Sequence, residues 1–360
     1  MTEPSMSSKE RVLTAFASEE PDRVPIDYDA NPGIDRRLKA HYGLRPDDHE
    51  GLRRALGVDF RYISAPYVGP TLHEDAPGDV KVDLWGIHRR WVEHETGGYW
   101  DYCDFPLQDA TVADVEAWPM PSPDDFDYSR IPTLCERYCD YCISAGSAGL
   151  GDIINSTGMV FHMERTLIGL MTDDPAVLRY IDRRLDILHD VTRRTLEAAD
   201  GRIDMLKMGE DLGTQIGPMI SLDLYRTHFR PRHQRFVDLG KAFDIPVMIH
   251  TCGSSSWAYE DFVEMGISVV DTLQPEAKHM SPAYLKATFG GRLAFHGCIS
   301  TAGPVATGTV EDTVAYCRNT LDVMMPNGGY CFAPTHQLQD NTPTRNAVAM
   351  YETARDDGRY

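Results

Sequence analysis

The sequence predicts an α/β fold, namely a (β/α)8 TIM barrel that carries an aromatic-rich hairpin insertion. Short apolar runs alternate with helical patterns from residue 140 onward, which is the order expected of parallel βαβ units. Together with two earlier runs they make eight units in 360 residues, which fits a barrel of this kind. No Gly-x-Gly-x-x-Gly turn supports the main alternative, an open doubly wound sheet.

The first part of the chain supplies an N-terminal helix and the first two strands. Val12, Leu13 and Phe16 recur at helical spacing, so we expect a helix over 8–18 that ends before Pro21. A strand is predicted at 24–28 and a second at 59–63. Two helices, at about 32–42 and 50–56, lie between these strands.

The pattern changes between residues 65 and 130. Residues 80–100 alternate and are rich in aromatic side chains, which is typical of an antiparallel hairpin, and a proline-rich loop follows. We interpret 65–130 as an insertion between early strands of a single domain over 1–360, because no polar linker delimits it. Its aromatic residues could form a lid or an aromatic-lined pocket, or could pack the hairpin itself: Tyr67, Trp85, Trp91, Trp100 and Tyr102.

The remaining elements are regular. The other six strands are expected at 140–146, 205–209, 246–250, 268–273, 293–299 and 329–333. The helices between them are expected at 160–171, 175–199, 223–242, 259–265, 282–289 and 310–324.

Charge and cysteine content exclude several classes of protein. The chain has 35 basic and 55 acidic residues, and its net charge of −20 argues against nucleic acid or an anionic membrane as a partner. Residues 1–10 contain no apolar core of a signal peptide, and no stretch is long enough to span a membrane. Eight cysteines are too sparse for a disulfide scaffold, and Cys139-x-x-Cys142 is better explained by packing than by redox or zinc chemistry. We therefore expect a cytoplasmic protein.

The apolar run at 246–250 ends in His250-Thr-Cys252. Side chains at positions i and i+2 of a strand point to the same face, so the imidazole and the thiol would converge where the strand leaves the sheet. Zinc accepts both ligand types, and the pair is therefore a candidate for half of a zinc site. The alternative is a buried histidine beside an inert cysteine.

Other strand ends of the predicted barrel carry polar side chains as well. Catalytic zinc sites use three protein ligands, which His250, Cys252 and one ligand from the last strand would supply. Glu210 and Asp211 could instead cap a turn, and His296 could be a hydrogen-bonded core residue. The side chains concerned are Glu210, Asp211, His296, Cys298 and His336. Cys331 lies too early in the last strand to reach the rim, and no role follows for it or for Cys298.

Several segments together resemble one protein family. They are Glu10-Arg-Val-Leu, Glu20-Pro-Asp-Arg-Val-Pro25, Gly209-Glu-Asp-Leu-Gly-Thr-Gln215, His250-Thr-Cys-Gly253, and Gly328-Gly-Tyr with Asn341-Thr-Pro343. In this order they resemble the uroporphyrinogen decarboxylase-like superfamily, over nearly the whole chain. The resemblance implies a (β/α)8 barrel. The superfamily contains decarboxylases that need no metal, and zinc-dependent methyltransferases that work with methylcobalamin carried on a corrinoid protein.

Two features of the sequence favour the methyltransferase branch. The decarboxylases have an Arg-Gln-x-Gly-Arg segment after the first strand, whereas residues 26–33 contain no arginine here. His250-x-Cys252 is similar to the zinc motif of the methyltransferases, whose third ligand is a cysteine near the last strand. Counted back from Pro343, that position falls on His336 here. The resemblance thus implies a His/Cys/His site in which Glu210 or Asp211 could close the fourth position.

We therefore expect a zinc-dependent methyltransferase that moves a methyl group between a small O-, N- or S-methyl compound and a corrinoid protein, which brings the methylcobalamin. Glu210, Asp211 or His296 could move the proton. One alternative is a metal-independent decarboxylase of a small carboxylate, in which Asp27 or Asp59 would polarise the substrate. Another is a non-enzymatic, zinc-stabilised binding protein. By resemblance, a homodimer is also possible.

Overall fold

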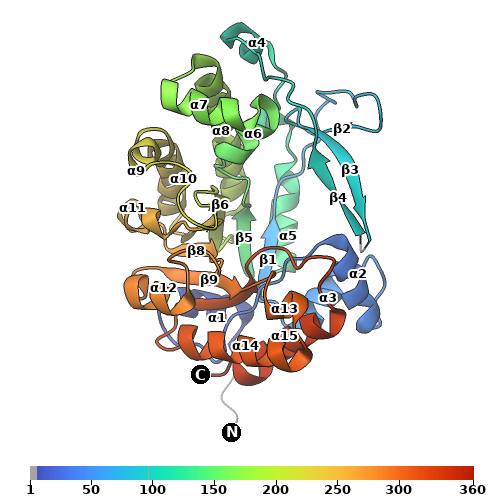
Figure 1. Cartoon of the computed structure of the whole chain (residues 1–360), viewed down its shortest axis with the longest axis vertical. Coiled ribbons are helices and arrows are strands. Elements are labelled where there is room, and N and C mark those ends of the chain that lie inside the picture. The colour runs from blue at the N-terminus through green and yellow to red at the C-terminus, as the bar shows by residue number, and fades with distance from the viewer. Residues whose placement is uncertain (1–5, 96) are drawn as a thin grey trace.

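A curled sheet of parallel strands forms the centre of the computed structural model, which describes residues 6–95 and 97–360 (Figure 1). The order of the strands in the sheet follows their order in the chain. The described strands of this sheet are β1 (Phe60–Ile63), β5 (Cys142–Gly146), β6 (Met205–Gly209), β7 (Val247–Thr251), β8 (Val269–Thr272), β9 (Ala294–Ile299) and β10 (Tyr330–Pro334). Every residue of β8, β9 and β10 is buried, as expected for parallel strands with both faces covered.

The segment 24–28, predicted as the first strand, lies between the two edges of this sheet. Ile26 forms a parallel bridge with Phe332 of β10, and its carbonyl accepts a hydrogen bond of 2.8 Å from the backbone N–H of Asp59. The prediction of a regular strand was wrong, because Pro25 has no N–H and the N–H of Ile26 donates to the side chain of Asp59. The two edges of the sheet are nevertheless linked through this segment, and the fold is TIM-barrel-like.

Helices connect the strands and pack around the outside of the sheet (Figure 1). They are α1 (Ser8–Phe16), α2 (Pro32–His41), α3 (His49–Leu56), α5 (Ile131–Arg137), α6 (Ile154–Phe161), α7 (Met163–Thr172), α8 (Pro175–Ala199), α9 (Leu222–Leu224), α10 (Arg230–Ala242), α11 (Tyr259–Met265), α12 (Pro282–Phe289), α13 (Pro304–Thr307), α14 (Val310–Met324) and α15 (Thr344–Asp357). Local sequence fixes several starts: Ser7 with Glu10, and Thr309 with Asp312, form capping boxes.

Two predicted helices differ from the structure. The helix expected over 160–171 starts at residue 154 and is divided into α6 and α7 by His162, whose φ of 72° lies outside the helical region. The helix expected over 223–242 contains a π-helical turn, η3 (Tyr225–Phe229), between α9 and α10. Pro231 follows this turn and has no N–H to donate to the carbonyl of Thr227, which accounts for the irregular backbone hydrogen bonds there.

A small antiparallel sheet lies between β1 and β5 in the chain. It consists of β2 (Lys81–Val82), β3 (His88–His94) and β4 (Gly97–Tyr102), and α4 (Val112–Ala117), η1 (Pro123–Asp125) and η2 (Tyr128–Arg130) follow it. Trp91 and Trp100 face each other across β3 and β4 with ring centroids 5.7 Å apart, and both remain 45% exposed. The start of β4 packs so closely on Asp340 that a Cβ atom on Gly97 would clash with its carboxylate.

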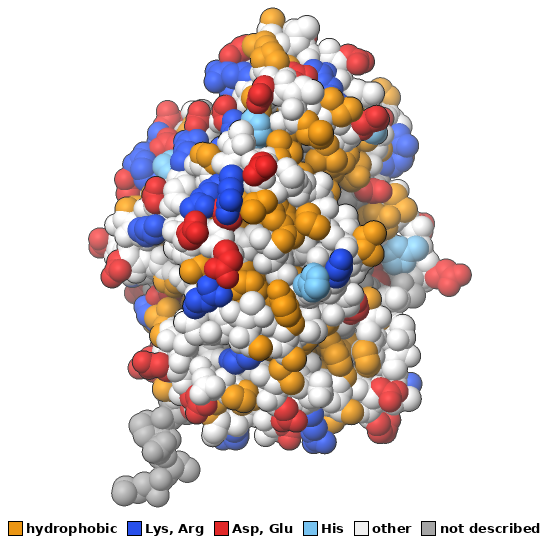
Figure 2. All heavy atoms as spheres, turned by 60° about the vertical axis from the view of Figure 1, so that its left-hand side comes forward, with side chains coloured by type: hydrophobic (Ala, Val, Ile, Leu, Met, Phe, Trp, Pro, Cys, Tyr) orange, Lys and Arg blue, Asp and Glu red, His pale blue; other side chains and the backbone are white. Residues whose placement is uncertain are grey.

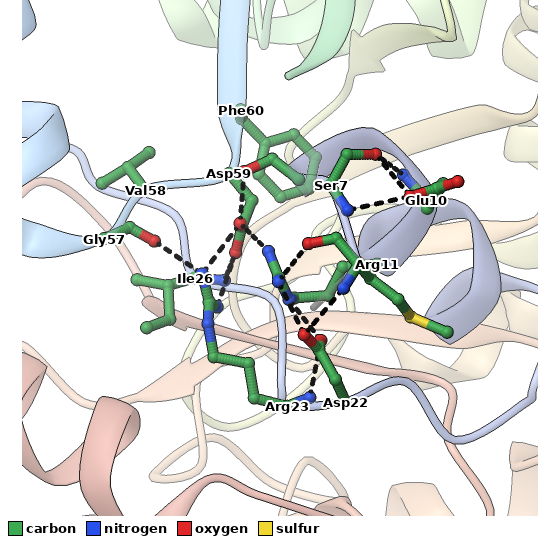
Figure 3. Close-up of polar contacts among 12 residues, drawn as sticks. Ser7, Glu10, Arg11, Asp22, Arg23, Ile26, Gly57, Val58, Asp59 and Phe60 are labelled. Atoms are coloured by element: carbon green, nitrogen blue, oxygen red, sulfur yellow. Dashed lines mark hydrogen bonds and ion pairs between the residues drawn. The ribbon is translucent and has the colours of Figure 1, made fainter. Parts of the chain in front are cut away.

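The amino-terminal end of the sheet is held together by buried ion pairs (Figure 3). Asp59, which precedes β1, is fully buried and accepts hydrogen bonds from Arg11 at 2.7 Å and from Arg23 at 2.8 Å. Asp22 binds the same Arg11 guanidinium at 2.6 Å. These contacts join α1, the segment 24–28 and β1 into one base. Asp59, considered above as a residue that polarises a substrate, is therefore part of this base and not of the opposite rim.

Acidic and basic side chains are intermixed on the side of the molecule that carries α9–α12 (Figure 2). Ion pairs link neighbouring helices there, such as Arg232 with Asp182 at 2.8 Å and Arg226 with Asp261 at 3.0 Å. In the described part of the chain, none of the helices has both the length and the apolar composition that crossing a membrane requires.

Candidate metal centre

The loops that follow β6, β7 and β10 meet at the carboxyl-terminal end of the sheet. His250 near the end of β7 lies close to Asp211 and Cys252 in these loops, and Cys252 also contacts His336 in the loop after β10, although these residues come from distant parts of the sequence. This is the end of a barrel at which loops after parallel strands build active sites. The side chains that the sequence analysis placed at strand ends thus divide into this group and others that lie elsewhere.

Cys252 is the centre of the group. Its Sγ lies 3.4 Å from Nε2 of His250 and 3.1 Å from Nε2 of His336. Ligand atoms around one tetrahedral zinc ion are separated by roughly 3.5 Å, given Zn–S and Zn–N distances of about 2.3 and 2.0 Å. Each imidazole nitrogen thus lies at about ligand spacing from Sγ of Cys252, but the ligand atoms that all lie within 4.8 Å of one another are those of Asp211, His250 and Cys252, and His336 is outside that set. The two imidazole rings stand at an interplanar angle of 83°.

Asp211 supplies an oxygen to the same group. Its Oδ1 lies 3.9 Å from Nε2 of His250 and accepts the backbone N–H of Cys252 at 3.1 Å, while its Oδ2 accepts Nδ2 of Asn155 at 2.8 Å. Single ligand atoms of Asp211, His250 and Cys252 lie within 4.8 Å of one another. Asp211, rather than Glu210, is thus the carboxylate beside the histidine and the cysteine.

Glu210 points away from this group. Its two carboxylate oxygens accept the backbone N–H groups of Ile153 at 2.7 Å and Ile154 at 3.1 Å, at the start of α6. The expectation that Glu210 could close the metal site is therefore corrected, because its side chain caps a helix N-terminus instead. Burial, followed by the charge of Asp152, raises the pKa of Glu210 well above its usual value.

The backbone around Cys252 depends on glycine. Gly253 has a φ of +69°, and a Cβ atom at this position would lie 2.3 Å from the carbonyl oxygen of Gly213. The loop after β7 thus packs directly on the loop after β6, and Gln274 accepts the N–H of Gly253 through its side chain at 2.5 Å. The glycine that follows His-x-Cys is required by this close approach of two backbones.

A carboxylate holds the far side of His250. Oδ2 of Asp271 lies 2.8 Å from Nδ1 of His250, and Oγ1 of Thr272 lies 2.6 Å from the same nitrogen. Thr272 has a φ of +88°, an uncommon conformation for a β-branched residue. With Nδ1 engaged in this way, Nε2 faces Cys252, which is how carboxylates orient histidine ligands of metals.

Asp271 also anchors a buried charge network beneath the group. Nζ of Lys207 lies 2.7 Å from Oδ2 of Asp271, and Nδ1 of His296 lies 2.6 Å from Oδ1. The other ring nitrogen of His296 lies 3.1 Å from Asp27, which also accepts the hydroxyl of Tyr62 at 2.6 Å. Both nitrogens of His296 are therefore engaged in the interior, and its imidazole is not part of the ligand group.

The pKa directions match this arrangement. Burial favours the neutral form of His296, but Cys331, Asp271 and Asp27 raise its pKa well above the usual value. Burial would also raise the pKa of Asp271, yet Lys207 and His296 hold it well below its ordinary range. We therefore expect His296 to be protonated and Asp271 to be ionised.

In the ligand group, by contrast, the surroundings favour the neutral forms of the side chains. Burial and the nearby carboxylate of Asp211 raise the pKa of the Cys252 thiol. Burial and the neighbouring His250 lower the pKa of His336, which keeps that imidazole neutral. A bound cation would offset the first effect, since metals deprotonate coordinating thiols.

Sequence reasoning missed Asp271 and Lys207. A signal was present, because each is a charged residue inside an apolar run, Val269-Val-Asp271 and Met205-Leu-Lys207. Charged residues are rarely buried unless they are paired. Cys298 and Cys331 are fully buried within β9 and β10, outside the ligand group.

The fold is TIM-barrel-like, and the candidate ligand group lies at the carboxyl ends of its strands. The model of the family Uroporphyrinogen decarboxylase (URO-D) matches residues 158–356, more than half of the chain. The chain belongs to this family. Among solved structures, it is similar to a methyltransferase from Methanosarcina mazei, with a TM-score of 0.63 and 17% sequence identity over 98% of this chain and 99% of that one. No curated protein sequence matches the chain.

Proposed function

We propose that this protein is a zinc-dependent methyltransferase, which moves a methyl group between a small O-, N- or S-methyl compound and a corrinoid carried on a partner protein. The observation that carries the proposal is the position of Sγ of Cys252 at the carboxyl-terminal end of the sheet. This atom lies 3.4 Å from Nε2 of His250 and 3.1 Å from Nε2 of His336. The fold of the Methanosarcina mazei methyltransferase gives further support.

The donor set suits zinc. One thiol and two imidazoles are the ligand types that zinc prefers, and three protein ligands leave a position for substrate, as in catalytic zinc sites. His250, Cys252 and His336 would hold the ion, and Asp211 would fill the fourth position when no substrate is bound. When bound, zinc would act as a Lewis acid toward the heteroatom of the methyl compound.

Residues of the chain supply positioning and proton transfer. Asp271 and Thr272 fix the ring of His250 through its Nδ1. Asp211, held by Asn155 and by the backbone of Cys252, is the carboxylate placed to take or return a proton at the substrate heteroatom. The reactive cobalt chemistry belongs to the corrinoid and would come with the partner protein.

Metal analysis tests the proposal directly. The purified protein should contain about one zinc ion per chain, and His250→Ala and Cys252→Ala should lose both zinc and methyl transfer. Cys139→Ala, which changes an exposed cysteine far from the group, is the control and should keep both. Absence of zinc from protein purified without chelators would overturn the proposal.

A metal-independent decarboxylase remains the second candidate, because the family contains such enzymes. In such an enzyme Asp27 would polarise the substrate; its carboxylate lies inside the barrel in contact with His296 and Tyr62. Asp27 is only 5% exposed, and both contacts restrict its reach to a substrate. Loss of a carboxylate from a substrate by protein stripped of metal would favour this candidate over methyl transfer.

A further inference from the structure

A cavity of about 340 Å³ opens beside the candidate metal centre. Asp211 and His250 line it together with Trp85 and Arg89 of the insertion and Arg184 of α8. In Figure 1 the sheet of β2–β4 lies beside α6, and residues of the insertion and of α6 line the cavity together. The volume lies in the range of small-molecule sites, so a substrate bound here would sit against the ligand group.

Arg184 is a buried cation that forms no close ion pair within the described residues. It is 7% exposed, and within the described residues no carboxylate lies within 4.0 Å of its guanidinium. Nη1 donates to the carbonyl of Asp152 at 3.1 Å and Nη2 to the carbonyl of Gly149 at 3.4 Å. The ring of Trp85 lies 4.9 Å from the guanidinium carbon. These contacts fix the position of the group, and its charge acts on the Asp152 carboxyl without forming an ion pair with it.

The donors of this guanidinium are not all used. Arginine has five N–H groups, and the two carbonyls account for one on each terminal nitrogen. Nε of Arg184 is buried without any hydrogen-bond partner. Because Nε has almost no accessible surface, the donors left for a ligand in the cavity are the remaining N–H groups of Nη1 and Nη2.

The carboxylates that line the cavity already have hydrogen-bond partners within the chain. The backbone donors are the N–H of Ser156 to Asp152 at 2.6 Å, of Cys252 to Asp211 at 3.1 Å, and of Trp85 and Ile87 to Asp83 at 2.9 and 3.0 Å. The cavity is therefore matched to a ligand that brings an acceptor and negative charge to Arg184, not to a ligand cation seeking a free carboxylate.

We propose that Arg184 recognises a carboxylate group of the substrate, so that the methyl compound is a small monoanion with an apolar body. This proposal rests on the proposed function of the adjoining metal centre. A monoanion fits better than a phosphate dianion, because Asp83, Asp152 and Asp211 lie in the same lining and would repel a second negative charge. Trp85 and Met159 provide the apolar surface for the body.

Matched pairs of probes test this inference through binding alone. 4-Methoxybenzoate and methoxyacetate should bind at least roughly tenfold more tightly than 4-methoxybenzamide and methoxyacetamide, since a hydrogen-bonded charge pair gives about that factor or more. Calorimetric titration of the full chain measures both members of each pair. Arg184→Gln should remove the preference for the carboxylate. Arg179→Gln, on the exposed face of the same helix, should keep it.

A second variant separates recognition from support of the loop that carries Asp152. Arg184→Lys retains the charge but not the planar fork, so it should show a smaller preference that still exceeds that of Arg184→Gln. Equal binding of acid and amide by the native protein, or a preference that survives in a folded Arg184→Gln protein, would overturn the inference. Thermal unfolding of each variant establishes that it is folded.

The titrations are made with metal-free and with zinc-loaded protein. A carboxylate preference that depends on Arg184 in both samples supports this inference even if the chain transfers no methyl group. Zinc binding and methyl transfer without any such preference would leave the proposed function intact and remove only the substrate class. The two proposals therefore fail in different ways.

Discussion

Sγ of Cys252 and Nε2 of His336 lie 3.1 Å apart, although 84 residues separate them in the chain. Cys252 follows β7 and His336 follows β10, and β8 and β9 stand between these strands in the sheet. Side chains from strands so far apart can meet only because the sheet curls. The ligand group is therefore a product of the barrel-like curvature and could not form on a flat sheet.

His336 is predicted to be the third zinc ligand. His336→Ala should reduce zinc affinity by at least about tenfold, because one of three protein ligands is lost, whereas His336→Cys should restore a competent ligand set. Zinc affinity is measured by competition with a chromophoric chelator. If His336→Ala binds zinc as tightly as the unchanged protein, the third ligand must be Asp211 or another group.

Asp271 is predicted to act on the metal through His250. Asp271→Asn should lower zinc affinity by about 10–100-fold, the usual effect of losing a partner that orients a histidine ligand. Asp261→Asn provides a matched control, since Asp261 is equally buried and also paired, with Arg226 and Arg230, but lies on α11. Unchanged zinc affinity in folded Asp271→Asn protein would contradict this role.

The base of the barrel should be sensitive to loss of one carboxylate. Asp59→Ala removes the shared partner of Arg11 and Arg23 and leaves two guanidinium groups without it. We expect the free energy of unfolding to fall by about 3–5 kcal/mol. Chemical denaturation measures this loss. The zinc content of the folded fraction should stay the same, because the base lies at the opposite end of the strands from Cys252.

Low pH should destabilise this amino-terminal end of the barrel through Asp22. Burial would raise the pKa of Asp22, but the hydrogen bond and charge of Arg11 hold it below the ordinary value. A carboxylate with a depressed pKa stabilises the fold at pH values above its unfolded pKa of about 3.9, and this contribution is lost as the pH falls through the lower folded pKa.

Asp22→Asn should therefore reduce stability by about 1–2 kcal/mol at pH 7. The difference between variant and unchanged protein should shrink steadily below about pH 4. Urea denaturation at a series of pH values gives both quantities. A difference that is the same at pH 7 and at pH 3 would mean that Asp22 acts through packing rather than through its charge.

The sequence predicted the parallel α/β architecture well, because strands buried on both faces leave long apolar runs between helical patterns. It also predicted that the His250 and Cys252 side chains converge, since positions i and i+2 of a strand share a face. The place of His336 beside them came from the resemblance and from its position after the last strand. Their role as metal ligands stays a prediction.

The direction of Glu210 could not be predicted in the same way. Glu210 and Asp211 are consecutive, so only one of them can face the ligand group, and strand periodicity does not say which once the strand has ended at Gly209. The start of α6 decides the matter, because its free backbone N–H groups bind the Glu210 carboxylate. Arg184 was missed because its helix pattern does not reveal which side chain reaches the cavity.

The link between Ile26 and β10 joins residues that are about 300 positions apart in the chain. Arg23 likewise bridges Arg359, close to the other terminus. A growing chain therefore displays His250 and Cys252 long before the strand that precedes His336 exists. The candidate metal centre can therefore be completed only after β10 has been made and has joined the sheet.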